Sequence, residues 1–127
     1  MWGRMRDRLS MTVLLLEDQP LIAIDTEAML RRVGFVNIVH LASVTQALDW
    51  FSAERPDLAV MEVSLQGEPS VTVAEHLARE NVPYLVYSGA NRSLVGDRIL
   101  HDARWLSKPS EPELLDTEIM HLLDRGR

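Results

Sequence analysis

The chain of 127 residues contains no cysteine, a single lysine and no long hydrophobic run. Without cysteine it can form no disulfide and offers no thiolate as a nucleophile or metal ligand, which is compatible with a reducing, cytoplasmic location. No apolar stretch approaches the roughly 18 residues that a membrane-spanning helix requires, so we expect no membrane partner. The net charge of -6 argues against nucleic acid as a direct partner.

The rest of the composition is that of an ordinary globular domain. Hydrophobic residues make up 46% of the chain and charged residues 25%, and 127 residues are enough to bury a sizeable core. We predict one domain over residues 11–127, preceded by a flexible N-terminal arm over residues 1–10.

Short apolar runs alternate with segments of helical periodicity along the chain. Strands are predicted over residues 13–16, 36–41, 58–61, 84–87 and 105–107. Helices are predicted over residues 19–33, 43–53, 70–80 and about 94–100, with a last helix from residue 110 or 111 to 123. Residues 66–69 are expected to form a loop. Five strand–helix units in this order predict an α/β fold, a five-stranded parallel sheet with helices on both faces.

Polar residues directly follow four of the predicted strands. They are Glu17 and Asp18, Glu62, Ser88 and Lys108. In open parallel sheets ligands bind at the carboxyl ends of the strands, so these side chains are expected to converge at one edge. Three acids, a hydroxyl and an ammonium indicate a phosphoryl and divalent-metal site. Lys108 is the only lysine among 13 basic residues, and we expect it to pair with Glu62 when no metal is bound.

With these residues placed, residues 12–123 resemble the receiver domain of two-component response regulators. The matching segments are residues 14–20 (LLLEDQP), 55–58 (RPDL), 88–89 (SG) and 105–109 (WLSKP). The resemblance implies a flavodoxin-like fold and a Mg²⁺ site made by Glu17, Asp18, Glu62 and the backbone carbonyl of Ser64. It also implies that Ser88, Trp105 and Lys108 act as switch residues.

Glu62 departs from the family, which has aspartate as the phosphoacceptor at this position. The additional methylene pushes the carboxylate into the space that a phosphoryl group would fill, and in-line attack tolerates little misplacement. We therefore expect a phosphorylation-independent receiver in which Glu62 acts as a partial phosphomimic. One alternative is a receiver that is still phosphorylated in a Mg²⁺-dependent phosphorelay, and another is a structural interaction module with a dead site.

The chain is not expected to be an enzyme. A Mg²⁺-dependent phosphatase or phosphotransferase would need an aspartate nucleophile with another acid two residues on, and Glu62-Val63-Ser64 supplies neither. Four histidines lack metal-ligand spacing and are interpreted as structural, namely His40, His76, His101 and His121.

The resemblance also implies partners and an interaction face. A stand-alone receiver would act through contacts with a histidine kinase, a phosphotransfer protein or a downstream effector. Partner docking or homodimerisation would use the face formed by residues 94–123. Ser110 follows Lys108-Pro109 where many relatives have phenylalanine, so the packing of the last helix is expected to differ from theirs.

Overall fold

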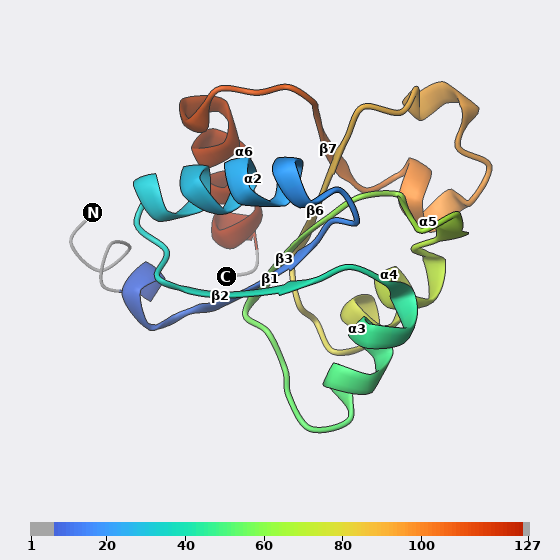
Figure 1. Ribbon diagram of the computed structural model, residues 1–127, viewed down its shortest axis with the longest axis horizontal. Coiled ribbons are helices and arrows are strands. Elements are labelled where there is room, and N and C mark those ends of the chain that lie inside the picture. Colours follow the sequence, from blue (N-terminus) through green and yellow to red (C-terminus); the bar gives the residue numbers. More distant parts are fainter. Residues whose placement is uncertain (1–6, 126–127) are drawn as a thin grey trace.

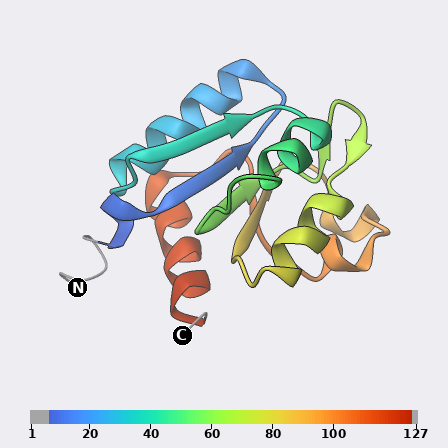
Figure 2. The same cartoon turned by 90° about the horizontal axis from the view of Figure 1, so that it is seen from below.

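The computed structural model of the protein describes residues 7–125, and five parallel strands form its central sheet (Figures 1 and 2). The strands are β1 (Thr12–Leu16), β2 (Asn37–Leu41), β3 (Leu58–Met61), β6 (Tyr84–Ser88) and β7 (Arg104–Ser107), arranged in the order β2-β1-β3-β6-β7. The helices are α2 (Pro20–Arg32), α3 (Val44–Phe51), α4 (Val71–Arg79), α5 (Arg98–His101) and α6 (Pro112–Arg125). The flavodoxin-like fold predicted from the sequence is confirmed.

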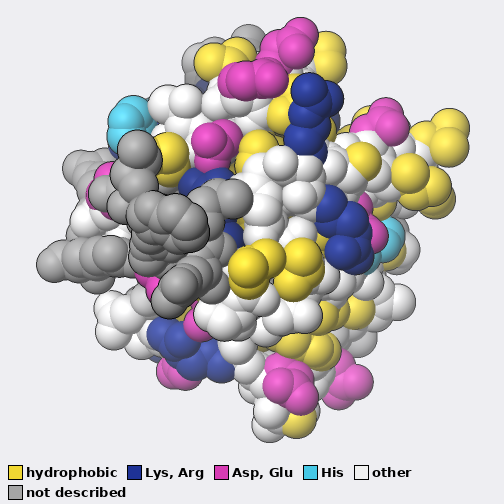
Figure 3. All heavy atoms as spheres, turned by 90° about the vertical axis from the view of Figure 1, so that its left-hand side faces the viewer, with side chains coloured by type: hydrophobic (Ala, Val, Ile, Leu, Met, Phe, Trp, Pro, Cys, Tyr) yellow, Lys and Arg dark blue, Asp and Glu magenta, His cyan; other side chains and the backbone are white. Residues whose placement is uncertain are grey.

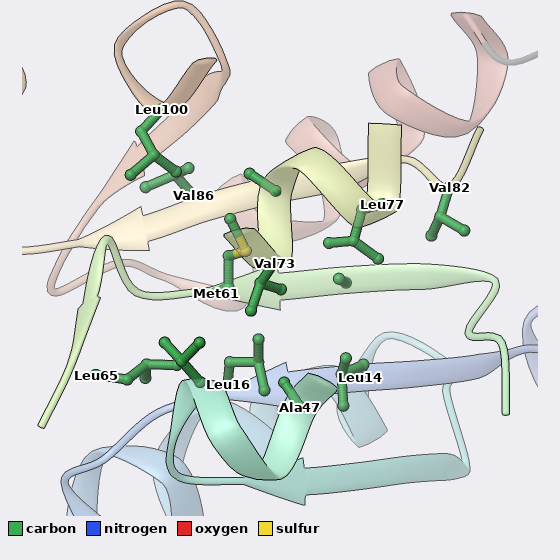
Figure 4. Close-up of a cluster of buried hydrophobic side chains, with 13 residues drawn as sticks. Leu14, Leu16, Ala47, Met61, Leu65, Val73, Leu77, Val82, Val86 and Leu100 are labelled. Atoms are coloured by element: carbon green, nitrogen blue, oxygen red, sulfur yellow. The ribbon is translucent and has the colours of Figure 1, made fainter. Parts of the chain in front are cut away.

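The inner strands are continuous apolar runs because helices cover both faces of the sheet. All four residues of β3 are fully buried, whereas the edge strand β2 is only partly buried. Alternate residues of β1 supply the two cores: Leu14 packs on the side of α3, α4 and α5 (Figure 4), and Leu15 packs on the side of α2 and α6. The sheet therefore holds its strand ends rigidly at one edge.

Local sequence signals account for the ends of the helices. Pro20 opens α2, where its missing N–H needs no partner, and Gly34 follows the helix with a φ of 110° that favours glycine. Ser43 caps α3 by accepting a hydrogen bond from the backbone N–H of Gln46 at 3.0 Å. These boundaries lie within a few residues of the predicted ones.

Residues 66–69, predicted as a loop, belong to a small β-hairpin. Its strands are β4 (Ser64–Leu65) and β5 (Glu68–Pro69), which pair antiparallel. The turn residues Gln66 and Gly67 have φ values of 52° and 82°, the left-handed pair that a tight two-residue hairpin turn requires. The sequence did not predict these strands because each has only two residues, too few for an alternating pattern to be recognised.

The segment between β6 and β7 contains less helix than predicted. A single 3₁₀ turn, η1 (Arg92–Leu94), is followed by the four-residue helix α5. The helix expected from about residue 94 thus begins at Arg98, where Asp97 precedes it. The Arg92 side chain links the start of this segment to its end, since its guanidinium donates hydrogen bonds to the carbonyl oxygens of His101 and Ala103, both at 2.8 Å.

The N-terminal arm predicted over residues 1–10 is described only from residue 7, and residues 1–6 lie outside the described part of the chain. Residues 7–10 are helical, and Arg8 is 5% exposed. Its guanidinium pairs with Asp116 of α6, donates to the Val33 carbonyl oxygen at 2.7 Å and lies 5.0 Å from the centre of the Phe35 ring. Over residues 7–10 the chain is therefore part of the packed domain.

Acidic and basic side chains are interspersed on the face of the molecule that Figure 3 shows. Within residues 7–125, no helix combines the length and the apolar character that crossing a bilayer requires.

Candidate functional site

A pocket of about 660 Å³ lies at the carboxyl edge of the sheet, between α2 and the segments that follow β3, β6 and β7. Five of the residues singled out in the sequence line it: Asp18, Glu62, Ser64, Ser88 and Lys108. The parallel register of the strands brings them together, as the topology predicts. Four of the five strand-end side chains predicted to converge therefore line this pocket, and the fifth, Glu17, is not among its lining residues but contacts Lys108.

The Glu62 carboxylate accepts three hydrogen bonds. Its Oε2 accepts from the backbone N–H of Val63 at 2.7 Å and from the hydroxyl of Ser88 at 2.5 Å. Its Oε1 accepts from the Lys108 ammonium at 2.9 Å, so the expected ion pair is present. The Glu62 side chain is only 16% exposed, and the Ser88 residue is fully buried. Charge-assisted bonds in such surroundings hold the carboxylate in one orientation.

Lys108 bridges two carboxylates, because its Nζ also donates to Oε1 of Glu17. Burial by itself would lower the pKa of Lys108, but the hydrogen bonds and negative charges of Glu17 and Glu62 outweigh it and raise the pKa above its ordinary value. Glu17 is 2% exposed, and its other carboxylate oxygen accepts from the backbone N–H of Gln19 at 3.1 Å. The ammonium is therefore the counter-ion of both acids.

Asp18 takes a different position from its neighbour Glu17. Its Oδ2 accepts a hydrogen bond from the backbone N–H of Gln66, in the turn of the β4–β5 hairpin, at 2.7 Å. This bond ties the end of β1 to the segment that follows β3. The hairpin also carries Ser64, whose backbone carbonyl was predicted as a metal ligand.

The carboxylates do not fit a Mg²⁺ site in this arrangement. Over residues 7–125 no group of three or more His, Cys, Asp or Glu side chains is placed to hold a metal together. The Lys108 ammonium occupies the position between Glu17 and Glu62, and one oxygen of Asp18 is engaged by the hairpin. A cation with about six oxygen ligands would require these contacts to be exchanged.

Trp105 is separate from the pocket. Its ring packs in the core on the side of α3, α4 and α5, and its indole N–H donates to the Leu100 carbonyl oxygen at 2.7 Å. The Arg92 guanidinium lies 5.7 Å from the centre of the indole ring. Trp105 therefore connects β7 to α5 and η1, while Ser88 and Lys108 face Glu62.

Three further residues of the pocket were missed in the sequence. Asp25 is on α2 and lines the pocket, and no pattern in the sequence distinguished it from the other polar residues of that helix. The Tyr87 hydroxyl accepts from the backbone N–H of Ser110 at 3.2 Å, and both residues line the pocket. Ser110 was noted only as a departure from the family, and Tyr87 gave no signal because it lies inside an apolar run.

Comparisons with known proteins identify the family to which this chain belongs. The chain matches the family model of the response regulator receiver domain over residues 13–120, and it therefore belongs to this family. The resemblance stated from the sequence is confirmed. No curated protein matches the chain.

Solved structures of receiver domains superpose on the whole fold. SdrG from Sphingomonas melonis Fr1 is 30% identical with a TM-score of 0.77, and the match covers 89% of this chain and 96% of that one. The PhyR stress response regulator is 27% identical with a TM-score of 0.76; the match covers 96% of this chain but 48% of that longer one.

A third structure, the receiver domain of sensor histidine kinase PA1611 from Pseudomonas aeruginosa PAO1, has magnesium coordinated in its active-site cleft. It is 24% identical with a TM-score of 0.75, and the match covers 90% of this chain and 98% of that one. At 24% identity this similarity supports the fold of the present chain alone.

Proposed function

We propose that this receiver domain signals without phosphorylation, with Glu62 imitating part of a phosphorylated aspartate. The observation that supports the proposal best is the 2.5 Å hydrogen bond from the buried Ser88 hydroxyl to the Glu62 carboxylate. In the family, the switch hydroxyl and the lysine turn toward the phosphoryl oxygens. Here both Ser88 and Lys108 already donate to Glu62.

The imitation is partial because the two groups differ in charge and in oxygen count. A carboxylate carries one negative charge on two oxygens, whereas a phosphoryl group carries about -1.5 to -2 on three. Both oxygens of Glu62 are occupied, one by Lys108 and the other by Ser88 and Val63. The switch hydroxyl is therefore held inward by a weaker but permanent charge.

The same contacts oppose phosphoryl transfer to Glu62. A nucleophilic oxygen must be free to approach phosphorus in line, and hydrogen bonds to both oxygens hold the carboxylate away from that geometry. Mg²⁺ would have to displace the ammonium of Lys108 from Glu17 and Glu62, so we propose that it binds weakly. The proposed signalling state uses no metal.

Output would pass through protein contacts on the face formed by η1, α5, β7 and α6. Trp105 links β7 to α5, and the exposed side chains of Leu94 and Leu114 offer apolar contacts at 81% and 55% exposure. A histidine kinase, a phosphotransfer protein, a downstream effector or a second copy of the chain are the partners that the family suggests. A cytoplasmic location stays a prediction.

Intact-mass measurement after incubation with acetyl phosphate and Mg²⁺ tests the absence of phosphorylation. We expect no adduct on the wild-type chain and a phosphoryl adduct on Glu62→Asp. Glu54→Asp is the matched control, since it shortens an exposed acid by the same methylene away from the pocket. An adduct on the wild type would contradict the proposal and favour the phosphorelay alternative.

Nuclear magnetic resonance of the Trp105 indole N–H distinguishes a phosphomimic from a dead site. We expect the wild-type signal to lie closer to that of phosphorylated Glu62→Asp than to that of the unphosphorylated variant. Ser88→Ala should move it toward the unphosphorylated position, because the hydroxyl that contacts Glu62 is removed. A wild-type signal at the unphosphorylated position would favour the structural module with a dead site.

A further inference from the structure

The pocket beside Glu62 extends well beyond the side chains that hold this residue. It continues between α2 and the segment after β7, and its volume of about 660 Å³ lies in the range of small-molecule sites. Its location also fits such a role, because ligands in open α/β sheets bind outside the carboxyl ends of the strands where the strand order reverses. Here β1 and β3 are the adjacent strands at that reversal.

Apolar side chains form much of the wall of this pocket. Ile22 and Met29 of α2 face it from one side, and Tyr87 and Pro109 face it from the sheet and the segment after β7. Ser110, which stands where many relatives have phenylalanine, also lines it. The Ser110 hydroxyl donates to the carbonyl oxygen of Glu111 at 2.9 Å, so this small side chain fills little of the space.

The charged groups of the pocket are mostly acidic. Three carboxylates line it, those of Asp18, Asp25 and Glu62, against one ammonium, that of Lys108, which leaves a net formal charge of -2. That ammonium is already shared between two acids, so it offers little to an anion. Burial raises the pKa of the Tyr87 phenol, the hydrogen bond from Ser110 and the charge of Lys108 lower it, and the negative charges of Glu17 and Asp25 raise it.

An apolar wall and an excess of negative charge together define a class of ligand. We propose that the pocket binds a small organic cation, a protonated amine carried on an aromatic or aliphatic body. The body would lie against Ile22, Met29 and Tyr87, and the ammonium would lie near Asp25 and Asp18. This proposal does not depend on whether Glu62 imitates a phosphoryl group.

Three indoles with the same ring and different charge test the proposal: tryptamine (cationic), tryptophol (neutral) and indole-3-acetate (anionic). Isothermal titration calorimetry in buffer free of divalent cations should give tryptamine a Kd of about 1 mM or tighter. Tryptophol should bind about threefold or more weakly, as expected for loss of one partly exposed ionic contact, and indole-3-acetate more weakly still. Absence of tryptamine binding, or equal affinity for tryptophol, would overturn the proposal.

Two variants and a control locate the site. Asp25→Asn should weaken tryptamine about threefold and leave tryptophol unchanged, because only the charge is removed. Ser110→Phe should weaken both by filling the pocket. Asp49→Asn makes the same chemical change as Asp25→Asn in α3, on the opposite face of the sheet, and should change neither.

Thermal melting of each variant shows whether it is folded. If Ser110→Phe fails to fold, the comparison of Asp25→Asn with Asp49→Asn still shows whether tryptamine binds in this pocket, because it depends on charge and not on packing. Equal tryptamine affinity in these two variants would place any binding outside the pocket and refute the assignment.

Discussion

The bridge that Lys108 makes between two carboxylates gives the most direct test of how this site is held together. Replacing Lys108 with methionine keeps most of the length of the side chain and removes its charge. Glu17, which is 2% exposed, would then be a buried carboxylate without a counter-ion, and Glu62 would lose one of its three donors. Both acids would remain close together, so their mutual repulsion would no longer be neutralised.

The expected loss of stability follows from this burial. Removing one partner of a buried ion pair destabilises a protein by about 3 to 5 kcal/mol. The Lys108 side chain is 12% exposed, so some water reaches the ammonium, and we expect about 3 kcal/mol. Glu17→Gln in the Lys108→Met background should recover about 1 kcal/mol or more, because it removes the uncompensated charge.

Urea unfolding followed by circular dichroism measures these differences. The pH dependence gives an independent check, since the folded pKa of Lys108 is raised above its ordinary value of 10.5. A raised pKa contributes stability that is present below pH 10.5 and is lost as pH rises through the folded pKa. The wild type should therefore lose stability in that alkaline range more steeply than Lys108→Met. The reasoning would be refuted if Lys108→Met lost less than about 1 kcal/mol of unfolding free energy at neutral pH, or if its stability fell with alkaline pH as that of the wild type does.

Two further predictions concern contacts away from Glu62. Trp105→Phe keeps an aromatic ring but removes part of the indole and its N–H bond to the Leu100 carbonyl oxygen, so we expect a loss of about 1 kcal/mol or more and faster hydrogen exchange over residues 90–103. Unchanged exchange there would show that this bond does not hold α5. Arg8→Met leaves Asp116 without its ion-pair partner and the Val33 carbonyl oxygen without this donor, and should lower stability by about 2 kcal/mol in urea unfolding. A loss of only a few tenths would mean that residues 7–10 contribute little to the folded domain.

Much of the fold was predictable from the sequence because its signals are local. Continuous apolar runs mark strands that are buried on both faces, and Pro20 and Ser43 mark the starts of two helices. Predictions failed where an element spans only about one repeat of the pattern. The hairpin strands have two residues each and α5 has four, too few for a periodicity to be recognised.

Arg8 shows a second reason why a contact was not predictable from the sequence. Arginines before the first strand are typical of a solvated arm, and nothing near Arg8 in the sequence indicates a buried partner. Asp116, its partner, lies 108 residues further along the chain. Only the packing of α6 beside α2 brings the two together.

The sequence by itself determined which residues stand at the carboxyl edge of the sheet, because strand direction and the position after each strand are local properties. Through the family resemblance, it also predicts that Glu62 stands where the family has its phosphoacceptor aspartate. The tertiary structure decided which donor each carboxylate oxygen receives. Glu62 accepts from Ser88, 26 residues away, and from Lys108, 46 residues away, while Asp18 turns to the hairpin. Hydrogen bonds act over about 3 Å, so partners this distant in sequence are selected only when the packed sheet fixes their relative positions.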